Sequence, residues 1–315
     1  MKKPIVVLTG PTAVGKTELS IQLAKAIGGE IISADSMQVY KYMDIGSAKI
    51  TPEEMDGVHH YLVDELEPFD EFHVVKFQEY AQKYLNEIYA HEKIPIIAGG
   101  TGFYIHALLN DIDFTEQESD SAYRKELEAL AEEHGNQYLH DRLKEVDPES
   151  AEAIHPNNRK RVIRALEFYQ ETGRKISEHN AKEQMRTSPY NFAYFVLNDE
   201  RSHLYKKIDA RVDKMIEDGL EAEVRRLKEM GCTKDMVAMQ GIGYKEMLSY
   251  LDGGYSLEEA VYIIKRETRH FAKRQITWFK RERDVIWLNK NEFDYKNEAI
   301  LAYMIKILKE KAIIS

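Results

Sequence analysis

The chain has 315 residues, of which 43% are hydrophobic, and a formal net charge of −10. This length and composition suffice for a globular protein with one large domain or two modest ones. The acidic balance argues against a protein that coats nucleic acid over its whole surface, because phosphate binding requires Lys and Arg, but it leaves room for a local basic face. The single cysteine, Cys232, excludes an intrachain disulfide and a cysteine-based zinc site.

The sequence shows no sign of membrane attachment or export. No apolar run approaches the roughly 20 residues that a membrane-spanning helix requires. Residues 5–8 pass directly into a glycine loop and are too short for the apolar core of a signal peptide. We therefore expect a cytoplasmic protein without a membrane contact.

Short apolar runs alternate with helical periodicity in the first third of the chain. Residues 5–9 predict a strand, and the apolar residues of 18–27 recur at helical spacing. Two further strands are predicted at residues 31–33 and 94–98, with a helix at 74–89 between them. This alternation is typical of an α/β fold, in which helices cover both faces of a parallel sheet.

The character of the sequence changes between residues 119 and 188, which are charged and helix-forming without a convincing strand. A strand pattern returns at 191–197, helical stretches follow to about residue 279, and residues 285–288 predict a last strand before a C-terminal helix. We therefore predict an α/β core made of residues 1–118 and 189–315, with a helical insertion domain at 119–188.

The loop after the first strand matches a phosphate-binding motif. Its residues follow the pattern G-x-x-x-x-G-K-[ST] and are Gly10, Pro11, Thr12, Ala13, Val14, Gly15, Lys16 and Thr17. The motif lies between a predicted strand and a predicted helix, which is the context that supports it. Backbone N–H groups, the helix N-terminus and Lys16 would hold phosphates, and the Thr17 hydroxyl could bind Mg²⁺. The core is thus predicted to be P-loop NTPase-like, with a diphosphate or a triphosphate as its ligand.

Polar residues also follow the next two predicted strands. The second strand leads into Asp35, Ser36, Met37 and Gln38, and the third leads into Gly99, Gly100, Thr101 and Gly102. Ligands of parallel sheets bind at the carboxyl ends of the strands. Asp35 is therefore a candidate general base or metal ligand, and Thr101 a candidate donor to a phosphate oxygen. The alternatives are an Asp that caps a turn and a Thr that caps a helix.

Positive charge gathers in two segments. Arg159, Lys160, Arg161 and Arg164 lie in the predicted insertion, and residues 265–283 are rich in Lys and Arg. Within an acidic protein, two basic segments suggest a surface that binds a polyanion. A solvated charged face with salt bridges is the alternative.

Two glycines interrupt helical sequence in the segment Gln240, Gly241, Ile242, Gly243, Tyr244 and Lys245. This segment could form a turn that touches nucleic acid. A plain connection between helices would give the same pattern.

Eight motifs occur in the order that is found in one enzyme family. They are G-P-T-A-V-G-K-T, D-S-M-Q-V-Y, D-I-G-S-A-K, G-G-T-G-F-Y, I-H-P-N-N, R-V-I-R-A-L-E, Q-G-I-G-Y-K-E and R-Q-I-T-W-F-K-R. They run from Gly10 to about Arg281, so they cover nearly the whole chain, and the later ones are not shared with P-loop kinases. The chain resembles the bacterial tRNA dimethylallyltransferase family, also called tRNA isopentenyltransferases or IPP transferases.

The resemblance implies an activity. Dimethylallyl diphosphate rather than ATP would occupy the P-loop, and the acceptor would be N6 of adenosine 37 in tRNAs that read codons beginning with U. Asp35 would remove the N6 proton, and Thr101 would bond the bridging oxygen of the leaving diphosphate. Lys16, Thr17 and Mg²⁺ would stabilise the charge of that diphosphate. Ser36 and Gln38 would help to hold the adenine after it has left the base stack.

The resemblance also implies a tRNA-binding surface, on which the insertion domain grips the anticodon stem-loop of the tRNA, and it implies a monomer. The residues that would bind tRNA are Asp35, Ser36, Met37, Gln38, Thr101, Arg124, Arg159, Lys160, Arg161, Val162, Ile163, Gln240, Gly241, Ile242, Gly243, Tyr244, Lys245 and Arg274. The chain departs from the family pattern at Ser47, where Thr is frequent, and at Asn158, where Asp is common.

A P-loop kinase of a nucleoside or another small molecule is the alternative function. It rests on the P-loop alone, for which ATP is the commonest ligand. The basic cluster at residues 159–164 could then be an arginine-rich lid over ATP.

Overall fold

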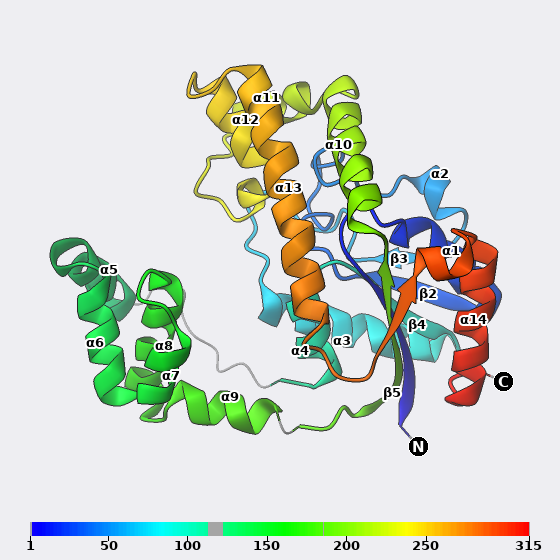
Figure 1. The fold of residues 1–315 in the computed structure, drawn as a ribbon, viewed down its shortest axis with the longest axis horizontal. Helices are drawn as coiled ribbons and strands as arrows, with labels where there is room; N and C mark the ends of the chain where they lie inside the picture. The colour runs from blue at the N-terminus through cyan, green and yellow to red at the C-terminus, as the bar shows by residue number, and fades with distance from the viewer. Residues whose placement is uncertain (1, 113–121, 185, 315) are drawn as a thin grey trace. The chain divides into compact units, whose positions relative to one another are not determined.

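The computed structural model describes residues 2–112, 122–184 and 186–314. The chain forms two compact units, and each is described by itself below (Figure 1). The first unit contains Met1–Leu109 and Pro189–Ser315, and the second contains Asn110–Ser188. The second unit therefore begins at Asn110 rather than at residue 119, and it ends at Ser188.

The first unit is built on a sheet of six parallel strands in the order β3-β2-β4-β1-β5-β6. This confirms the predicted α/β fold with a parallel sheet. Strand β1, one of the two middle strands, pairs with β4 on one side and with β5 on the other. The strands are β1 (Lys3–Thr9), β2 (Gly29–Ser33), β3 (His60–Tyr61), β4 (Ile94–Gly99), β5 (Tyr190–Asn198) and β6 (Val285–Asn289).

Helices cover both faces of this sheet (Figure 1). The α-helices of the unit are α1 (Lys16–Ile27), α2 (Pro52–Met55), α3 (Val74–Ala90), α4 (Gly102–Leu109), α10 (Arg201–Glu217), α11 (Leu220–Glu229), α12 (Tyr244–Leu251), α13 (Leu257–Phe279) and α14 (Asn297–Glu310). Two short 3-10 helices, η1 (Ala238–Gln240) and η2 (Lys290–Phe293), complete its described elements.

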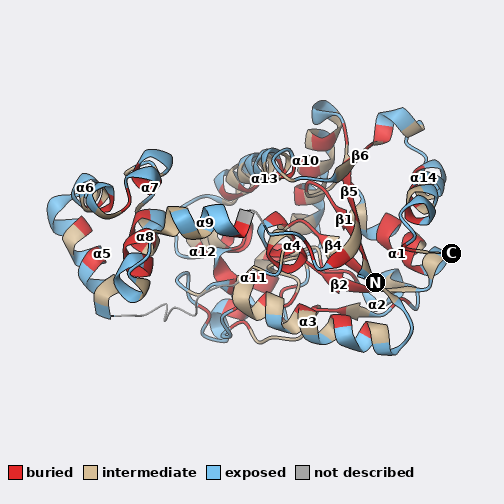
Figure 2. Ribbon diagram, turned by 90° about the horizontal axis from the view of Figure 1, so that it is seen from below, coloured by how far each residue is buried: buried red, intermediate tan, exposed pale blue. Residues whose placement is uncertain are grey.

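The alternation of side chains along β1 explains why both faces must be covered. Ile5 and Val7 pack into one buried core with α3, α4, α11 and α12, whereas Val6 and Leu8 pack into a second core with α1 and α14. Successive side chains of a strand point to opposite faces, so an apolar strand such as β1 requires helices on each side. Figure 2 shows the buried residues on the strands and on the helix faces that pack against them.

Helix α13 is the longest described helix, with 23 residues, and it begins at a capping box. The Ser256 side chain accepts a hydrogen bond from the backbone of Glu259 at 3.2 Å, and the Glu259 carboxylate accepts one from the backbone of Ser256 at 2.8 Å. Each side chain thus satisfies an N–H group that has no partner inside the helix.

The second unit is helical in its described part, with helices α5 (Ala122–His134), α6 (Asn136–Val146), α7 (Pro148–Ala153), α8 (Arg159–Thr172) and α9 (Ile176–Gln184). Its core is apolar and includes Leu127, Leu143 and Leu166. The buried carboxylate of Asp147 accepts hydrogen bonds from the backbone and the hydroxyl of both Ser150 and Ser177, at 2.7–3.1 Å. Asp147 therefore joins the starts of α7 and α9.

No helix among residues 2–112, 122–184 and 186–314 has both the length and the apolarity needed to cross a bilayer.

Candidate active site

The ends of β1, β2 and β4 lie side by side because these strands are neighbours in the sheet. The backbone of Thr101 donates a hydrogen bond to the carbonyl of Ala34 at 3.1 Å, and the Thr9 hydroxyl donates to the carbonyl of Gly99 at 2.6 Å. A Cβ atom at Gly99 would lie 2.3 Å from the carbonyl oxygen of Ala34, so only glycine permits this approach. The three polar strand ends predicted from the sequence are thus held together at one edge.

The P-loop connects β1 to α1 through residues with positive φ. Gly10 has φ 148° and Gly15 has φ 101°, and a Cβ atom at Gly10 would lie 2.2 Å from the carbonyl oxygen of Leu197 in β5. Ala13 also has positive φ, at 63°. Gly15 stands at the N-cap of α1, where no side-chain hydrogen bond caps the helix. The N–H groups of the first helical turn can therefore be directed at an anion.

Lys16 and Arg211 are two cations in the cavity beside the P-loop, and burial shifts the pKa of each. The Lys16 ammonium donates hydrogen bonds to the carbonyls of Gly10 at 3.0 Å and Pro11 at 2.9 Å. Burial, together with the charge of Arg211, lowers the pKa of Lys16 to about 8, although Asp35 acts in the opposite direction. Burial also lowers the pKa of Arg211, again opposed by Asp35. Close cations of this kind create a strong preference for an anion between them.

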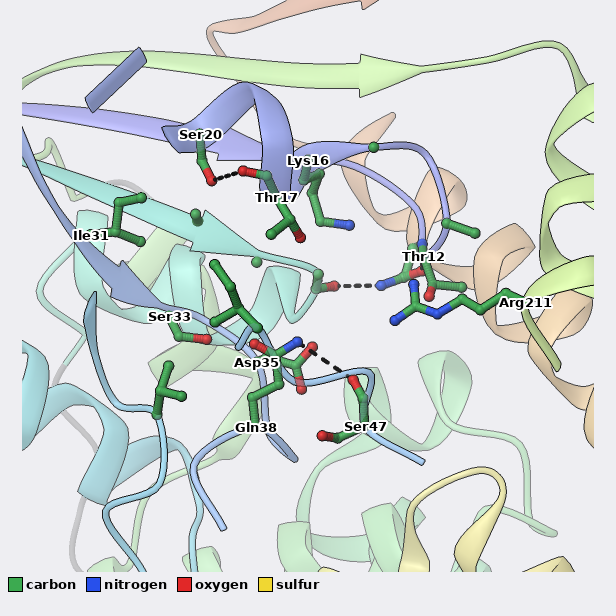
Figure 3. A pocket seen from close by; sticks show the side chains of 18 of the residues that line it. Thr12, Lys16, Thr17, Ser20, Ile31, Ser33, Asp35, Gln38, Ser47 and Arg211 are labelled. Carbon is green, nitrogen blue, oxygen red and sulfur yellow. Dashed lines mark hydrogen bonds between the residues drawn. The ribbon is translucent and has the colours of Figure 1, made fainter. Parts of the chain in front are cut away.

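A cavity of about 470 Å³ opens at this edge of the sheet (Figure 3). Its walls come from the P-loop, from the ends of β2 and β4, and from one face each of α10 and α13. It is lined by Thr12, Ala13, Gly15, Lys16, Thr17, Ser20, Ile31, Ser33, Asp35, Gln38, Ser47, Ile50, His60, Val63, Ala98, Gly99, Gly100, Lys207, Ala210, Arg211, Phe271 and Gln275. Cations therefore stand in the same cavity as a carboxylate and an amide.

The cavity brings together many, though not all, of the residues that the sequence singled out. Lys16, Thr17, Asp35 and Gln38 line it. Ser36, Met37 and Thr101 do not, and neither do Gly10, Pro11 and Val14 of the P-loop. Thr101 directly follows the lining residue Gly100, and its backbone bond to Ala34 holds it beside the end of β2.

The lining residues that the sequence did not predict include two pairs on helices, Lys207 and Arg211 on α10 and Phe271 and Gln275 on α13. Each pair is spaced four residues apart, which places both side chains on one face of a helix. That spacing is visible in the sequence, but it does not reveal which helix face meets the P-loop.

The segment predicted to touch nucleic acid around Gly241 is largely buried. Tyr244 is fully buried, and its hydroxyl donates to the carboxylate of Glu223 at 2.8 Å. Gln240 is exposed, and Lys245 is half-buried. Burial directs the Tyr244 side chain into the protein, so a direct contact of this side chain with a polyanion would require a rearrangement.

The basic residues predicted on α13 differ in their partners. Lys265 forms an ion pair with Asp213 of α10 at 2.5 Å, and Arg269 pairs with Asp209 of the same helix. Arg274 is exposed and lies over the ring of Phe271, 5.8 Å from its centroid. Part of this basic segment therefore joins α13 to α10, as in the salt-bridge alternative.

The predicted tRNA-binding residues of the second unit also divide into two groups. Lys160 and Arg161 are exposed in the first turn of α8, where Arg159 is half-buried. Val162 and Ile163 belong to the apolar core of that unit. Arg124 forms a two-bond ion pair with the buried carboxylate of Glu167, at 3.0 and 2.5 Å.

Metal ligation by protein side chains alone is not indicated. Within the described ranges, no group of three or more His, Cys, Asp or Glu side chains is arranged to hold a metal ion. A P-loop Mg²⁺ site differs, because phosphate oxygens and water supply most of its ligands beside one protein hydroxyl. Thr17, which lines the cavity next to Lys16, fits that role.

Comparisons with known proteins agree with this architecture. The family model described as IPP transferase matches residues 38–282. The chain is 64% identical over 313 residues to a tRNA dimethylallyltransferase of Lachnoclostridium phytofermentans, with 99% of each protein covered.

Solved structures are similar over most of the chain. The full-length tRNA isopentenylpyrophosphate transferase of Bacillus halodurans is 45% identical with a TM-score of 0.74, covering 99% of this chain and 98% of that one. A eukaryotic dimethylallyltransferase, studied while acting on tRNA, is 32% identical with a TM-score of 0.79, covering 91% of this chain and 74% of that one. The P-loop cavity, the parallel sheet and these similarities together show that the chain belongs to the IPP transferase family.

Proposed function

We propose that this protein is a tRNA dimethylallyltransferase. It transfers a dimethylallyl group from dimethylallyl diphosphate to N6 of adenosine 37 in tRNAs that read codons beginning with U, and it releases diphosphate. The observation that carries this proposal is one cavity with two chemically different sides, cationic at Lys16 and Arg211 and carboxylate-bearing at Asp35. A diphosphate leaving group suits the first side, and a nucleophile that must lose a proton suits the second.

The cationic side stabilises the leaving group. As the bond between C1 of the dimethylallyl group and the bridging oxygen breaks, negative charge grows on the diphosphate. The P-loop N–H groups, Lys16 and Arg211 are already in place to receive that charge, and Lys207 lines the same cavity. Mg²⁺ bound by Thr17 and the phosphate oxygens would neutralise further charge. Thr101 lies next to Gly100 and donates to the bridging oxygen.

The other side prepares the acceptor. Asp35 accepts a hydrogen bond from the backbone of Met37 at 2.9 Å, which orients one carboxylate oxygen and leaves the other for the substrate. N6 attacks C1, the C1–O bond breaks, and the N6 proton passes to Asp35. Gln38 lines the same cavity and holds the adenine, and Ser36, which follows Asp35 in the chain but does not line the cavity, assists it. The base reaches this cavity only after it has left the anticodon stack.

The remainder of the anticodon stem-loop binds outside the cavity. The exposed cations Lys160 and Arg161 on α8 and Arg274 on α13 suit contacts with RNA phosphates. The eukaryotic relative acting on tRNA supports an RNA acceptor for this chain. We infer that the protein works as a monomer in the cytoplasm, where it meets its tRNA.

The competing reading, a small-molecule P-loop kinase, is disfavoured because the relatives are named as tRNA dimethylallyltransferases and tRNA isopentenylpyrophosphate transferases. The deciding experiment incubates the protein and Mg²⁺ with radiolabelled dimethylallyl diphosphate and unmodified tRNA. A transcript with guanosine at position 37 and an assay of ATP consumption run beside it. Label only on tRNA with adenosine 37 is expected. ATP consumption with a small acceptor and no label on tRNA would overturn the proposal.

A further inference from the structure

One buried carboxylate organises a loop at the rim of the cavity. Glu223 of α11 is 5% exposed, and it accepts hydrogen bonds from the backbone N–H groups of Asp44 at 2.9 Å, Ile45 at 2.8 Å and Gly46 at 3.0 Å. Three successive N–H groups of one loop therefore converge on a single side chain from another part of the chain. Bonds of this kind to a charged acceptor are among the strong ones in proteins.

Tyr244 completes the support of this loop. Its hydroxyl donates to the same Glu223 carboxylate at 2.8 Å. Its ring lies so close to Gly46 that a Cβ atom there would be 2.6 Å from the Tyr244 ring. Burial raises the pKa of Tyr244 well above its ordinary value, and the charge of Glu223 adds to this, so the hydroxyl remains a donor.

The loop that Glu223 and Tyr244 support is hydrogen-bonded to Gln38, the residue proposed to hold the adenine. The Gln38 amide donates to the carbonyls of Ala48 at 3.2 Å and Ser47 at 3.4 Å, and both Gln38 and Ser47 line the cavity (Figure 3). The loop thereby sets how the Gln38 amide is turned. Because these two carbonyls hold the Gln38 NH₂ group, the amide oxygen is left as the acceptor, and an amide oxygen can accept a hydrogen bond from N6 of adenine.

The segment around Tyr244 also touches the loop that follows β2. A Cβ atom at Gly241 would lie 2.8 Å from the Met37 sulfur, so glycine allows the two segments to meet. The same short segment therefore packs against both loops that bear cavity residues beside Asp35.

We propose that Glu223 and Tyr244 are positioning residues that fix the loop at residues 44–48 and, through it, the base-holding orientation of Gln38. This inference rests on the proposed function. It assigns Tyr244 a role inside the protein instead of a direct contact with tRNA, and it adds Glu223, which touches no substrate.

The test uses the full chain and three variants. Glu223→Gln keeps the shape of the side chain but removes its charge and replaces one acceptor oxygen by a donor. Tyr244→Phe keeps the ring on Gly46 and removes only the hydroxyl. Glu221→Gln is the matched control, because Glu221 lies on the same helix and pairs with Arg225 on the surface.

Three quantities are measured for each variant, namely hydrogen exchange of the backbone at residues 44–48, the steady-state constants with tRNA, and the affinity for inorganic pyrophosphate. For Glu223→Gln we expect faster exchange in this segment and a KM for tRNA raised about tenfold, since two or more hydrogen bonds to the carboxylate weaken. KM should change more than kcat, because the amide holds the base in the ground state and in the transition state alike. Tyr244→Phe should raise the exchange rate at residues 44–48 and the KM for tRNA by smaller amounts. Glu221→Gln should match the wild type in both quantities.

Pyrophosphate affinity should stay unchanged in all variants, which separates the loop from the P-loop. Wild-type exchange and wild-type KM in Glu223→Gln would overturn the proposal, as would an equal loss of pyrophosphate affinity. If the wild-type protein transfers no dimethylallyl group to tRNA, the proposed function fails. Hydrogen exchange at residues 44–48 in Glu223→Gln and Tyr244→Phe still decides whether these side chains fix the loop.

Discussion

Gln275 accepts a hydrogen bond from the backbone N–H of Thr12 at 2.9 Å and so ties α13 to the tip of the P-loop. The same buried amide donates to the carbonyl of Gly100 at 2.9 Å. A single side chain therefore sets the distance between the loop that holds the diphosphate and the strand end that carries Thr101. Through this bridge, a shift of the P-loop would also shift the end of β4, which precedes Thr101.

Replacing Gln275 by Leu should lower both the affinity for pyrophosphate and the stability of the protein. The Thr12 N–H and the Gly100 carbonyl lose their common partner, so we expect unfolding free energy to fall by about 1–3 kcal/mol. Pyrophosphate affinity should fall roughly tenfold because the P-loop N–H groups lose their alignment. Chemical denaturation and calorimetry measure the two effects, with the exposed Thr277→Ala on the same helix as control. Unchanged pyrophosphate affinity would show that the P-loop does not depend on this bridge.

Arg211 should contribute chiefly to the affinity for the diphosphate. Replacing it by Gln removes a cation that lines the cavity while leaving the α10 backbone intact. We expect pyrophosphate affinity to fall by about 10- to 100-fold, the effect of losing one or two charge-assisted hydrogen bonds. Binding of tRNA alone should change little. Arg201→Gln is the control, because Arg201 lies at the exposed start of the same helix over the ring of Tyr205. An equal loss of pyrophosphate affinity in the two variants would contradict a direct role of Arg211 in diphosphate binding.

The lowered pKa of Lys16 predicts how pyrophosphate binding depends on pH. Lys16 in the free protein loses its proton as pH rises through about 8, well below the ordinary value of 10.5. Its attraction for the anion is therefore complete below pH 8 and declines above it, by up to about tenfold per pH unit for one linked proton. Calorimetry between pH 6.5 and about 9.5 measures this decline. Lys16→Arg, which keeps its charge throughout this range, reports the titration of pyrophosphate itself. A decline of the same size in that variant would exclude Lys16 as its source.

Asp147 should control the stability of the second unit. Burial alone would raise the pKa of Asp147, but the hydrogen bonds from Ser150 and Ser177 outweigh it and hold the pKa below its ordinary value. The stabilisation is thus present at neutral pH and is lost as pH falls through the lowered pKa. Asp147→Ala should cost about 2–4 kcal/mol, since several buried donors lose their acceptor. Limited proteolysis within residues 122–184 and thermal unfolding report this loss. Two results would contradict this account: an Asp147→Ala variant as resistant to proteolysis as the wild type, or a wild-type protein whose second unit loses no stability at acidic pH.

Much of the fold follows from local pattern. The P-loop motif at residues 10–17 and the apolar run before it identify β1, the loop and α1, and the runs near residues 94–98 and 191–197 identify β4 and β5. Strand β3 has only His60 and Tyr61, too short for a period-two pattern to register. The order of strands was not predicted, because pairing across the sheet depends on contacts that local sequence does not encode.

The residues of the site likewise divide into those that a local sequence pattern marks and those that only the tertiary packing brings there. Lys16 and Asp35 could be found because a motif or a strand end marks them. Arg211 and Gln275 reach the cavity only because α10 and α13 pack where they do, and no local pattern in the sequence distinguishes them from other helix residues. Tyr244 stands in a glycine-containing segment that suggested a surface turn, but its burial against Gly46 and Glu223 is a tertiary contact.

The central claim is that Asp35 accepts the proton from N6 at the carboxylate side of a diphosphate site. Single-turnover transfer by Asp35→Asn, with tRNA and pyrophosphate affinities measured on the same preparation, tests it most directly. We predict that the transfer rate falls by about 10²- to 10⁴-fold, the usual contribution of a general base, while both affinities stay near those of the wild type. A wild-type transfer rate, or a loss of tRNA affinity as large as the loss of rate, would contradict the role assigned to Asp35.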